Sequence, residues 1–306
     1  MKWKKRGLIY SPKSDLTWAS NTALQPTPHV RAAEKTIRVF AGFRDQEGVS
    51  RVGFVDVSVE NPAEVLRVSK TPALDVGRPG AFDENGVVPC AIIERDEKLY
   101  LYYAGYQLGQ KVKFYVFSGL AISEDGGSSF SRHSEVPICD RTDRELFFRV
   151  IHSIIYEEGR WRVWYGGGSE YTLSRDGKQL PNYNIRYTES RDGYQLEEDF
   201  QVCIDMKSGE YRVGRPFVIR SHDRYRMFYS AGTETEGYRL AYAESEDGIV
   251  WQRKDDEIGI DVASHGWDSE MQCYPSVVSS GRRTFLFYNG NNYGEDGFGY
   301  AELEHW

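Results

Sequence analysis

The sequence has no long apolar run, few cysteines and no excess of basic residues. None of its apolar stretches approaches the roughly 18–20 residues that span a bilayer, so we expect no membrane span. Residues 1–6 are basic, but only four residues follow before Ser11-Pro12, a shorter stretch than a signal peptide needs. The four cysteines lie far apart without a CxxC pair, which indicates reduced thiols. We therefore expect a cytoplasmic protein.

Charge and motif content exclude further classes. The 46 acidic residues outnumber the 38 lysines and arginines, and a net charge of −8 argues against nucleic acid or an anionic membrane as a partner. The six histidines show no HxxxH or HxH spacing, so we predict no metal site. There is also no P-loop, no G-x-S-x-G and no G-x-G-x-x-G after a strand, and we predict no cofactor.

Aromatic residues and glycine are abundant. The chain has 21 Tyr, 15 Phe, 7 Trp and 30 Gly among its 306 residues. This mixture favours strands and tight turns over helices. Such a length is ample for a core without disulfide or metal staples.

The chain repeats about every sixty residues. Five segments share an apolar strand, a polar turn and an aromatic strand that ends in Gly: 37–42, 99–105, 161–166, 225–232 and 284–290. Counting back about thirteen residues from each strand's end gives positions 59 to 64 residues apart, namely Pro28, Pro89, His152, Pro216 and Pro275. A fixed period of this kind is the signature of a repeat architecture.

A third strand in the middle repeats ends in Ser-x-Asp-Gly. The three copies contain Asp125, Asp192 and Asp247, and a further strand follows each. Asp-Gly supplies the positive φ angles that a tight hairpin needs. We interpret these carboxylates as turn-formers that accept local backbone hydrogen bonds.

Four strands per unit, repeated five times without helical periodicity, predict an all-β fold: a five-bladed β-propeller with four-stranded antiparallel blades. The fifth repeat stops one strand short at residues 297–303, and residues 7–10 are apolar and unassigned. We predict that this N-terminal strand closes the last blade and removes an exposed edge. Residues 1–306 then form a single propeller domain.

One mouth of the central channel is predicted to carry the chemistry. The residues before each inner strand, and the loops between second and third strands, fall on the same face. Carboxylates facing each other there suit acid–base work on a glycosidic bond. We expect Asp83, Glu270 and Glu145 as catalytic groups. The candidate substrate-binding residues are Arg44, Asp45, Tyr106, Arg149, His152, Arg215, Trp267, Asp268, Asn289 and Asn291.

The arginines on this face allow two interpretations. Guanidinium groups match carboxylate and phosphate oxygens in pairs, so Arg44, Arg149 and Arg215 would bind an anionic ligand. Alternatively, they form ion pairs with Asp45, Asp83, Glu145 and Glu270 that hold the blades in register.

The whole chain resembles the five-bladed propeller glycosidase-like superfamily, which includes glycoside hydrolase families 43, 32, 62 and 130. The resemblance rests on the inner-strand prolines, the Ser-x-Asp-Gly turns and the segment 82–87 (FDENGV). The closing segments 266–271 (GWDSEM), 274–275 and 288–291 resemble those of cytoplasmic members that accompany surface-polysaccharide assembly.

The departures from that pattern leave two classes of function open. Families 32 and 43 carry a catalytic Asp in the first blade, a second Asp in the next and a Glu acid in the third. Here residues 21–28 contain no carboxylate, Asp83 matches the second position, and Glu145 matches the third only approximately. One class is an enzyme that acts on a glycosidic bond of an intracellular anionic sugar, phosphorylated or nucleotide-linked. The other is a sugar-binding or scaffolding propeller without catalysis. For the enzyme, the reaction would be hydrolysis, phosphorolysis or glycosyl transfer, and the sequence pattern is compatible with all three. The sequence pattern does not indicate an oligomeric state.

Overall fold

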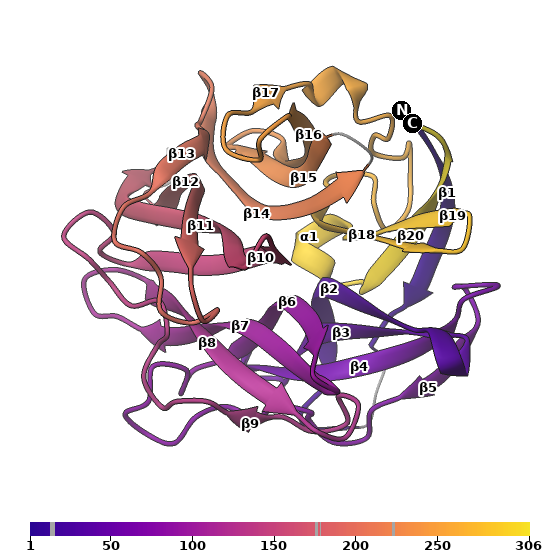
Figure 1. Cartoon of the computed structure of the whole chain (residues 1–306), viewed down its shortest axis with the longest axis horizontal. Coiled ribbons are helices and arrows are strands. Elements are labelled where there is room, and N and C mark those ends of the chain that lie inside the picture. Colours follow the sequence, from indigo (N-terminus) through magenta and orange to yellow (C-terminus); the bar gives the residue numbers. More distant parts are fainter. Residues whose placement is uncertain (13–15, 175–176, 178, 222–223) are drawn as a thin grey trace.

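The strands are arranged in five blades around a central axis, as the sequence predicts (Figure 1). The computed structural model describes residues 1–12, 16–174, 177, 179–221 and 224–306. The first blade consists of β2 (Asn21–Arg31), β3 (Thr36–Arg44), β4 (Ser50–Ser58) and β5 (Val65–Val68). The second consists of β6 (Val87–Arg95), β7 (Lys98–Leu108), β8 (Phe114–Ser123) and β9 (Ser131–Arg132).

The other three blades follow the same order. The third consists of β10 (Phe148–Glu157), β11 (Arg160–Leu173), β12 (Gln179–Ser190) and β13 (Gln201–Ile204). The fourth consists of β14 (Glu210–Ser221), β15 (Arg224–Thr233), β16 (Gly237–Ser245) and β17 (Gln252–Arg253). The fifth consists of β18 (Cys273–Ser280), β19 (Arg283–Asn289), β20 (Phe298–His305) and β1 (Lys2–Tyr10).

Strand β1 closes the ring, which confirms the predicted closure by the N-terminal strand. It runs antiparallel to β20 from the Lys2–His305 pair to the Tyr10–Phe298 pair. Trp3 on β1 is buried, and its ring lies edge-on to Phe228 of the fourth blade at 6.0 Å. The edge of β20 is therefore covered by paired backbone and by an aromatic contact with the neighbouring blade.

Aromatic and aliphatic side chains fill the spaces between neighbouring blades. Between the third and fourth blades, for example, buried Trp164 packs in one cluster with Met227 and Tyr229. The aromatic strands that mark the repeat in the sequence therefore form the interfaces between blades. Besides strands, the described residues contain only short helical turns: η1 (Ala32–Glu34), η2 (Asp255–Glu257) and α1 (Asn291–Gly294). Within that part of the chain, no helix has the length and apolar character needed to cross a membrane.

The Ser-x-Asp-Gly turns have the predicted role. Asp125 accepts hydrogen bonds from the backbone N–H groups of Ser128 and Ser129, both at 2.9 Å. Asp192 and Asp247 accept equivalent bonds from the backbone that follows them. These hydrogen bonds hold the pKa of Asp125 at about 2, although partial desolvation opposes them.

Each inner strand has a β-bulge, and the bulges determine which side chains reach the axis. The antiparallel register skips Gln25, His152, Arg215 and Tyr274 on four of the inner strands. Gln25, Arg215 and Tyr274 have positive φ angles of 55°, 55° and 59°, and a proline follows each. In the first blade this proline is Pro26, so the sequence-based placement of the repeat at Pro28 is two residues late.

The bulged residues are backbone outliers. A left-handed conformation at a residue other than glycine costs about 1–3 kcal/mol, and such residues cluster at functional sites. A bulge also redirects the side chain of the extra residue. The conformations at Gln25, Arg215 and Tyr274 therefore indicate a functional site at the centre of the propeller.

Candidate functional site

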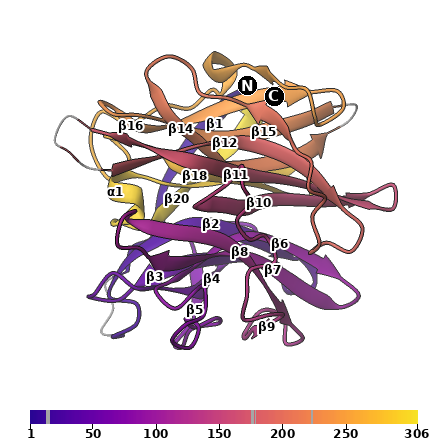
Figure 2. The same ribbon diagram turned by 90° about the vertical axis from the view of Figure 1, so that its left-hand side faces the viewer.

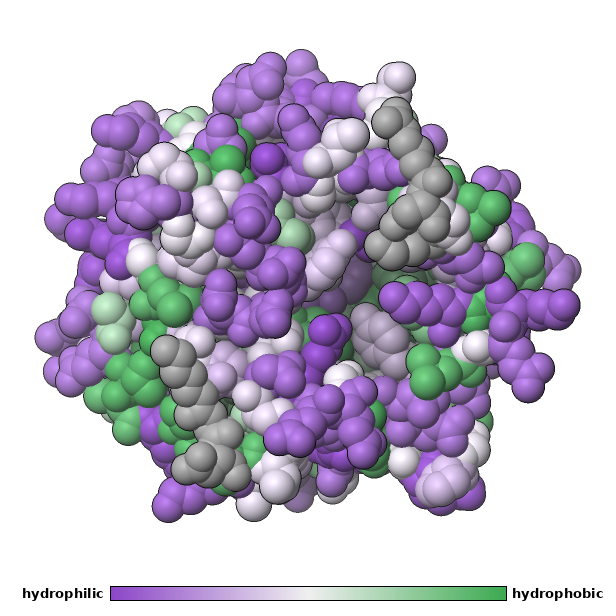
Figure 3. Space-filling model, turned by 180° about the vertical axis from the view of Figure 1, so that it is seen from behind, coloured by the Kyte–Doolittle hydropathy of each residue, from purple (hydrophilic) through white to green (hydrophobic). Residues whose placement is uncertain are grey.

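A pocket of about 740 Å³ lies at the mouth of the central channel. All five blades contribute to it, through the first halves of the inner strands and through the segments near the connections between second and third strands. Figure 2 shows α1 at one face of the propeller, and Figure 3 shows that face with a hollow near its centre. The face predicted to carry chemistry is thus the face with the pocket.

The lining is cationic and aromatic. Its positively charged residues are Arg44, Lys113, Arg212 and Arg215. Its tyrosines are Tyr106, Tyr183, Tyr211, Tyr238, Tyr274 and Tyr293. Among the described residues that line the pocket, none is an aspartate or a glutamate.

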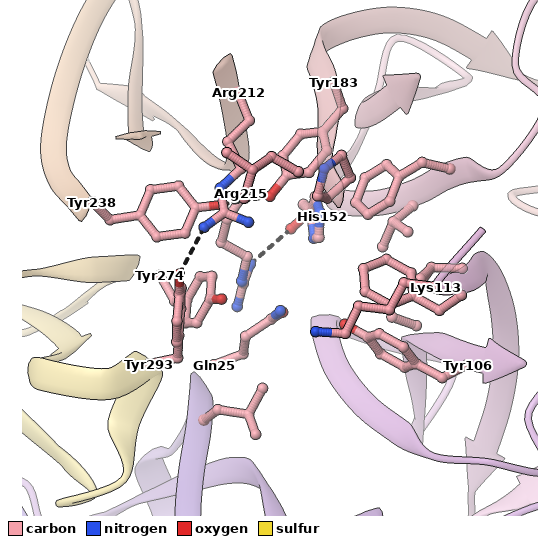
Figure 4. A pocket seen from close by; sticks show the side chains of 18 of the residues that line it. Gln25, Tyr106, Lys113, His152, Tyr183, Arg212, Arg215, Tyr238, Tyr274 and Tyr293 are labelled. Carbon is pink, nitrogen blue, oxygen red and sulfur yellow. Dashed lines mark hydrogen bonds between the residues drawn. The ribbon is translucent and has the colours of Figure 1, made fainter. Parts of the chain in front are cut away.

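Arg215 lies at the floor, with a side chain that is only 2% exposed (Figure 4). Its guanidinium donates to the carbonyl oxygen of His152 at 3.3 Å and to the hydroxyls of Thr27 and Ser276 at 3.0 and 3.3 Å. No carboxylate of the described chain forms an ion pair with it. Burial lowers the pKa of Arg215 to about 10, so the group is still a cation at neutral pH.

His152 lies beside Arg215 and is also buried. Its Nδ1 has no hydrogen-bond partner within the described part of the chain. Burial, and to a smaller extent the positive charge of Arg215, lower the pKa of His152 well below its usual value. The imidazole is therefore neutral at neutral pH.

Tyrosines form a wall around Arg212. The guanidinium lies 4.2 Å from the ring centre of Tyr238 and donates to the hydroxyl of Tyr293 at 3.0 Å. The hydroxyls of Tyr183 and Tyr238 are in direct contact. Desolvation raises the pKa of Tyr238 well above its usual value, so this phenol keeps its proton. The ring of Tyr183 stacks on Phe148 with centroids 4.3 Å apart.

Gln25 and Lys113 complete the pocket from the first and second blades. Gln25 is 6% exposed, and its backbone N–H donates to Asn289 Oδ1 at 2.7 Å. Residues 21–28 are the first-blade segment in which the resemblance to families 32 and 43 implies an acid, and Leu24 and Gln25 of that segment line the pocket. Lys113 is exposed at the rim and points toward the space above Gln25 in Figure 4.

Asp83 lies outside the pocket lining. Its side chain is 0% exposed, and its Oδ2 accepts hydrogen bonds from Arg132 at 2.8 Å and Tyr103 at 3.0 Å. Glu145 is 1% exposed and forms ion pairs with Arg149 at 2.8 Å and Arg186 at 2.9 Å. Both carboxylates are therefore bound to arginines within the protein.

Glu270 is exposed and also lies outside the pocket lining. Its backbone N–H donates to Asn291 Oδ1 at 2.8 Å, and its carbonyl accepts from Arg239 at 2.8 Å. The structure thus does not bring Asp83 and Glu270 together across an open pocket, because one is buried in an ion pair and the other is on a surface loop. Their catalytic role stays a sequence-based prediction that this geometry does not support.

Four of the ten predicted binding residues line the pocket: Arg44, Tyr106, His152 and Arg215. The other six have partners elsewhere in the protein. Asp45 pairs with Arg51 at 2.7 Å, Asp268 with Lys5 at 2.7 Å, and Arg149 with Glu145. Trp267 stacks on Tyr288, Asn289 bonds backbone of the first blade, and Asn291 bonds the backbone of Glu270 and Met271.

Sequence reasoning missed most of the aromatic lining and Lys113. Tyr274 directly precedes an inner-strand proline, so its place in the repeat was an available signal. Arg212 lies three residues before Arg215, in a segment already placed at this mouth. For Tyr183, Tyr293 and Lys113, which lie near connections of different length, the sequence contains no comparable signal.

A search for matching family models finds none. The "Uncharacterized protein Rv1502" of Mycobacterium tuberculosis is 34% identical over 305 residues, which cover 99% of this chain and 100% of that protein. The chain belongs to the same family as Rv1502. Since identity extends over both chains from end to end, this relative has all the segments that form the five blades here.

Solved structures share the fold at low identity. A thermostable family-43 glycoside hydrolase is 19% identical with a TM-score of 0.70, and the match covers 96% of this protein and 90% of that one. A glycosyl hydrolase from Bacteroides ovatus is 12% identical with a TM-score of 0.73 and coverages of 99% and 93%. These matches establish the propeller fold of such glycoside hydrolases.

Proposed function

We propose that this protein binds an anionic saccharide, with the acidic group of the sugar at Arg215. The observation that carries the proposal is a buried guanidinium at the floor of an open pocket, with no carboxylate partner in the part of the chain that the structure describes. Removing a charge from water costs several kcal/mol unless an opposite charge compensates it. A ligand carboxylate or phosphate would provide that compensation and form charge-assisted hydrogen bonds.

The walls of the pocket favour a sugar as the carrier of that charge. Binding pockets for small molecules combine apolar and aromatic surface with a few polar groups that fix orientation. Here six tyrosines provide rings and hydroxyls at once, and Gln25 and His152 add polar groups beside Arg215. The fold shared with glycoside hydrolases supports the same class of ligand.

The pocket also favours recognition of one terminal residue. Arg215, His152 and Gln25 are buried at the floor, while Lys113 and Tyr293 are exposed at the rim. A saccharide would insert its charged end and leave the rest of its chain toward the rim. Arg44 and Lys113, which also lack a carboxylate partner within the described residues, would then increase the attraction for an acidic ligand.

Titration calorimetry with matched sugars tests this function. Glucuronate and glucose differ only in the carboxylate, and so do galacturonate and galactose; hexose phosphates present the other anion. We expect at least one acidic sugar to bind at least tenfold more tightly than its neutral counterpart, with an affinity that decreases with added salt. Equal binding of acidic and neutral sugars, or none at all, would refute the proposal.

A further inference from the structure

The proposed function leaves open what the pocket does to a bound sugar. Building on that function, we propose that the pocket cleaves the glycosidic bond of a uronate by β-elimination. In this reaction Arg215 binds the carboxylate, His152 removes the proton from the adjacent carbon, and the Tyr183–Tyr238 pair protonates the leaving oxygen. The substrate class is therefore a saccharide with a uronate at the cleaved bond.

The described lining of this pocket has no groups that match those of hydrolysis. Most glycoside hydrolases use two carboxyl groups, roughly 5–10 Å apart, on either side of the bond. The described lining has none, and Asp83 and Glu145 are held by arginines beneath the surface. An elimination requires no carboxylate nucleophile and no water, so the absence of acids from the lining does not oppose it.

Arg215 meets the first requirement of the reaction. The proton next to a carboxylate is hard to remove because the resulting enolate would carry two negative charges. A cation fixed at the carboxylate stabilises that charge as it develops. Arg215 has five N–H donors, and three hydrogen bonds to His152, Thr27 and Ser276 fix the guanidinium in place.

His152 meets the second requirement, because a base must be unprotonated before the reaction. Its backbone is held beside the guanidinium, since its carbonyl accepts a hydrogen bond from Arg215, and the residue lines the same pocket. Its burial and the adjacent cation disfavour the imidazolium form. The ring therefore enters the reaction as a free base, and its Nδ1, although buried, is not engaged by any described residue.

The tyrosine pair meets the third requirement, because an acid must hold its proton. The contact between the two hydroxyls and the cation of Arg212 near Tyr238 provide a short proton-donating network on the pocket wall. Desolvation keeps Tyr238 protonated, and the positive charge of Arg212 would stabilise the phenolate that forms after proton transfer. The surroundings thus keep His152 unprotonated and Tyr238 protonated, as a general base and a general acid must be before the reaction.

The reaction balances without a further reactant. His152 takes the proton from the α-carbon, and that C–H electron pair forms a double bond between the α- and β-carbons. The β-carbon–oxygen bond breaks, and the leaving oxygen takes a proton from the tyrosine pair. Return of the proton from the imidazolium to the phenolate restores both groups, and the two products together have the atoms of the substrate.

The decisive experiment incubates the wild-type protein with oligogalacturonates and with glucuronate-containing oligosaccharides of defined length. We expect a product with the ultraviolet absorbance of an unsaturated uronate. Mass spectrometry should find the summed product mass equal to that of the substrate, and water enriched in heavy oxygen should leave no label in either product.

Variants separate binding from chemistry. His152→Gln should lower the rate about 10²–10⁴-fold while calorimetry still detects the uronide. Tyr183→Phe keeps the ring stacked on Phe148 and should also slow the reaction with little change in affinity. Arg220→Gln, on the same strand as Arg215 but half-exposed and paired with Glu157, is the matched control and should leave the rate unchanged.

The outcomes distinguish the two proposals. Uronides that bind but give no unsaturated product would overturn the elimination and leave the binding function intact. A product that incorporates water would also overturn it, in favour of hydrolysis. Binding of hexose phosphates without uronides would refute the inference alone, whereas failure of all acidic sugars to bind would refute both.

Discussion

Arg149 and Arg215 are buried arginines on the inner strands of neighbouring blades, yet they have opposite surroundings. Arg149 on β10 forms an ion pair with Glu145 at 2.8 Å and donates to the carbonyl of Asp140. Among the described residues, the hydrogen-bond partners of Arg215 on β14 are a backbone carbonyl and two hydroxyls. The first guanidinium has its counter-ion inside the protein, while under our proposal a bound ligand supplies the counter-ion of the second.

This contrast bears on the two interpretations of the arginines. Where a carboxylate is supplied by the chain, as at Glu145 and Asp83, the ion pair joins segments of the propeller. At Arg215, where the described residues supply none, the arginine lines an open pocket. A buried charge without a partner lowers stability, and perturbed ionisable groups cluster at functional sites.

The largest expected effect comes from breaking the internal ion pairs. Glu145→Gln removes the carboxylate from between Arg149 and Arg186 and leaves two cations close together. We expect the free energy of unfolding to fall by about 3–5 kcal/mol, measured by chemical denaturation. Glu135→Gln, which breaks an exposed pair with Arg78, should cause no measurable change. Equal stability of the two variants would contradict a structural role for Glu145.

The opposite result is expected at Arg215. Arg215→Met removes a buried cation without leaving a carboxylate unpaired, so the free energy of unfolding should rise or stay within about 1 kcal/mol. Binding of an acidic sugar should weaken about 10–100-fold, since a hydrogen bond to a charged group is worth about 1.5–3 kcal/mol. Titration calorimetry and denaturation on the same samples check both parts; a large loss of stability with unchanged binding would reverse the assignment.

A smaller effect is expected in the pH dependence of stability, which should include a contribution from His152 beside Arg215. The pKa of His152 lies well below its value in the unfolded chain, about 6.5, because of burial and the charge of Arg215. Below about pH 6.5 the unfolded chain therefore binds a proton that the folded protein does not. As the pH falls below that value, the free energy of unfolding should decrease by up to about 1.4 kcal/mol for each pH unit. His152→Gln should lose this component, and identical pH dependence of variant and wild type would show that the imidazole is not shielded.

The smallest effect is expected at the face opposite the pocket. Asp125→Ala removes the acceptor for two backbone N–H groups in one Ser-x-Asp-Gly turn. We expect a loss of about 1 kcal/mol, reduced by solvent at this exposed site, and unchanged affinity for acidic sugars. Thermal unfolding and calorimetry check this prediction, and altered sugar binding would show that the two faces are coupled.

The fold could be predicted from the sequence because each blade repeats the same local signals. Aromatic strand ends and Asp-Gly turns such as that at Asp125 act over short distances. The apolar strand at residues 7–10 could be placed because the last repeat lacked one strand, although its partner β20 lies at the other end of the chain. The placement of the repeat in the first blade was less accurate, with Pro28 in place of Pro26. Two prolines lie within three residues there, and spacing alone does not distinguish them.

The site could be predicted only in part. The sequence placed Arg44, Tyr106, His152 and Arg215 at one mouth of the channel, and these residues line the pocket there. It could not show which arginine meets a carboxylate, because Glu145 reaches Arg186 of another strand and Asp83 reaches Arg132 across 49 residues. Bulges add to the difficulty, since one inserted residue changes which side chains point toward the axis.

A crystal structure with bound glucuronate tests the central claim most directly, because the claim concerns the position of a single negative charge. We expect the sugar in the pocket at the channel mouth, with its carboxylate within hydrogen-bond distance of the Arg215 guanidinium and its ring against the tyrosines. A carboxylate directed toward solvent, or a sugar bound away from Arg215, would contradict the account.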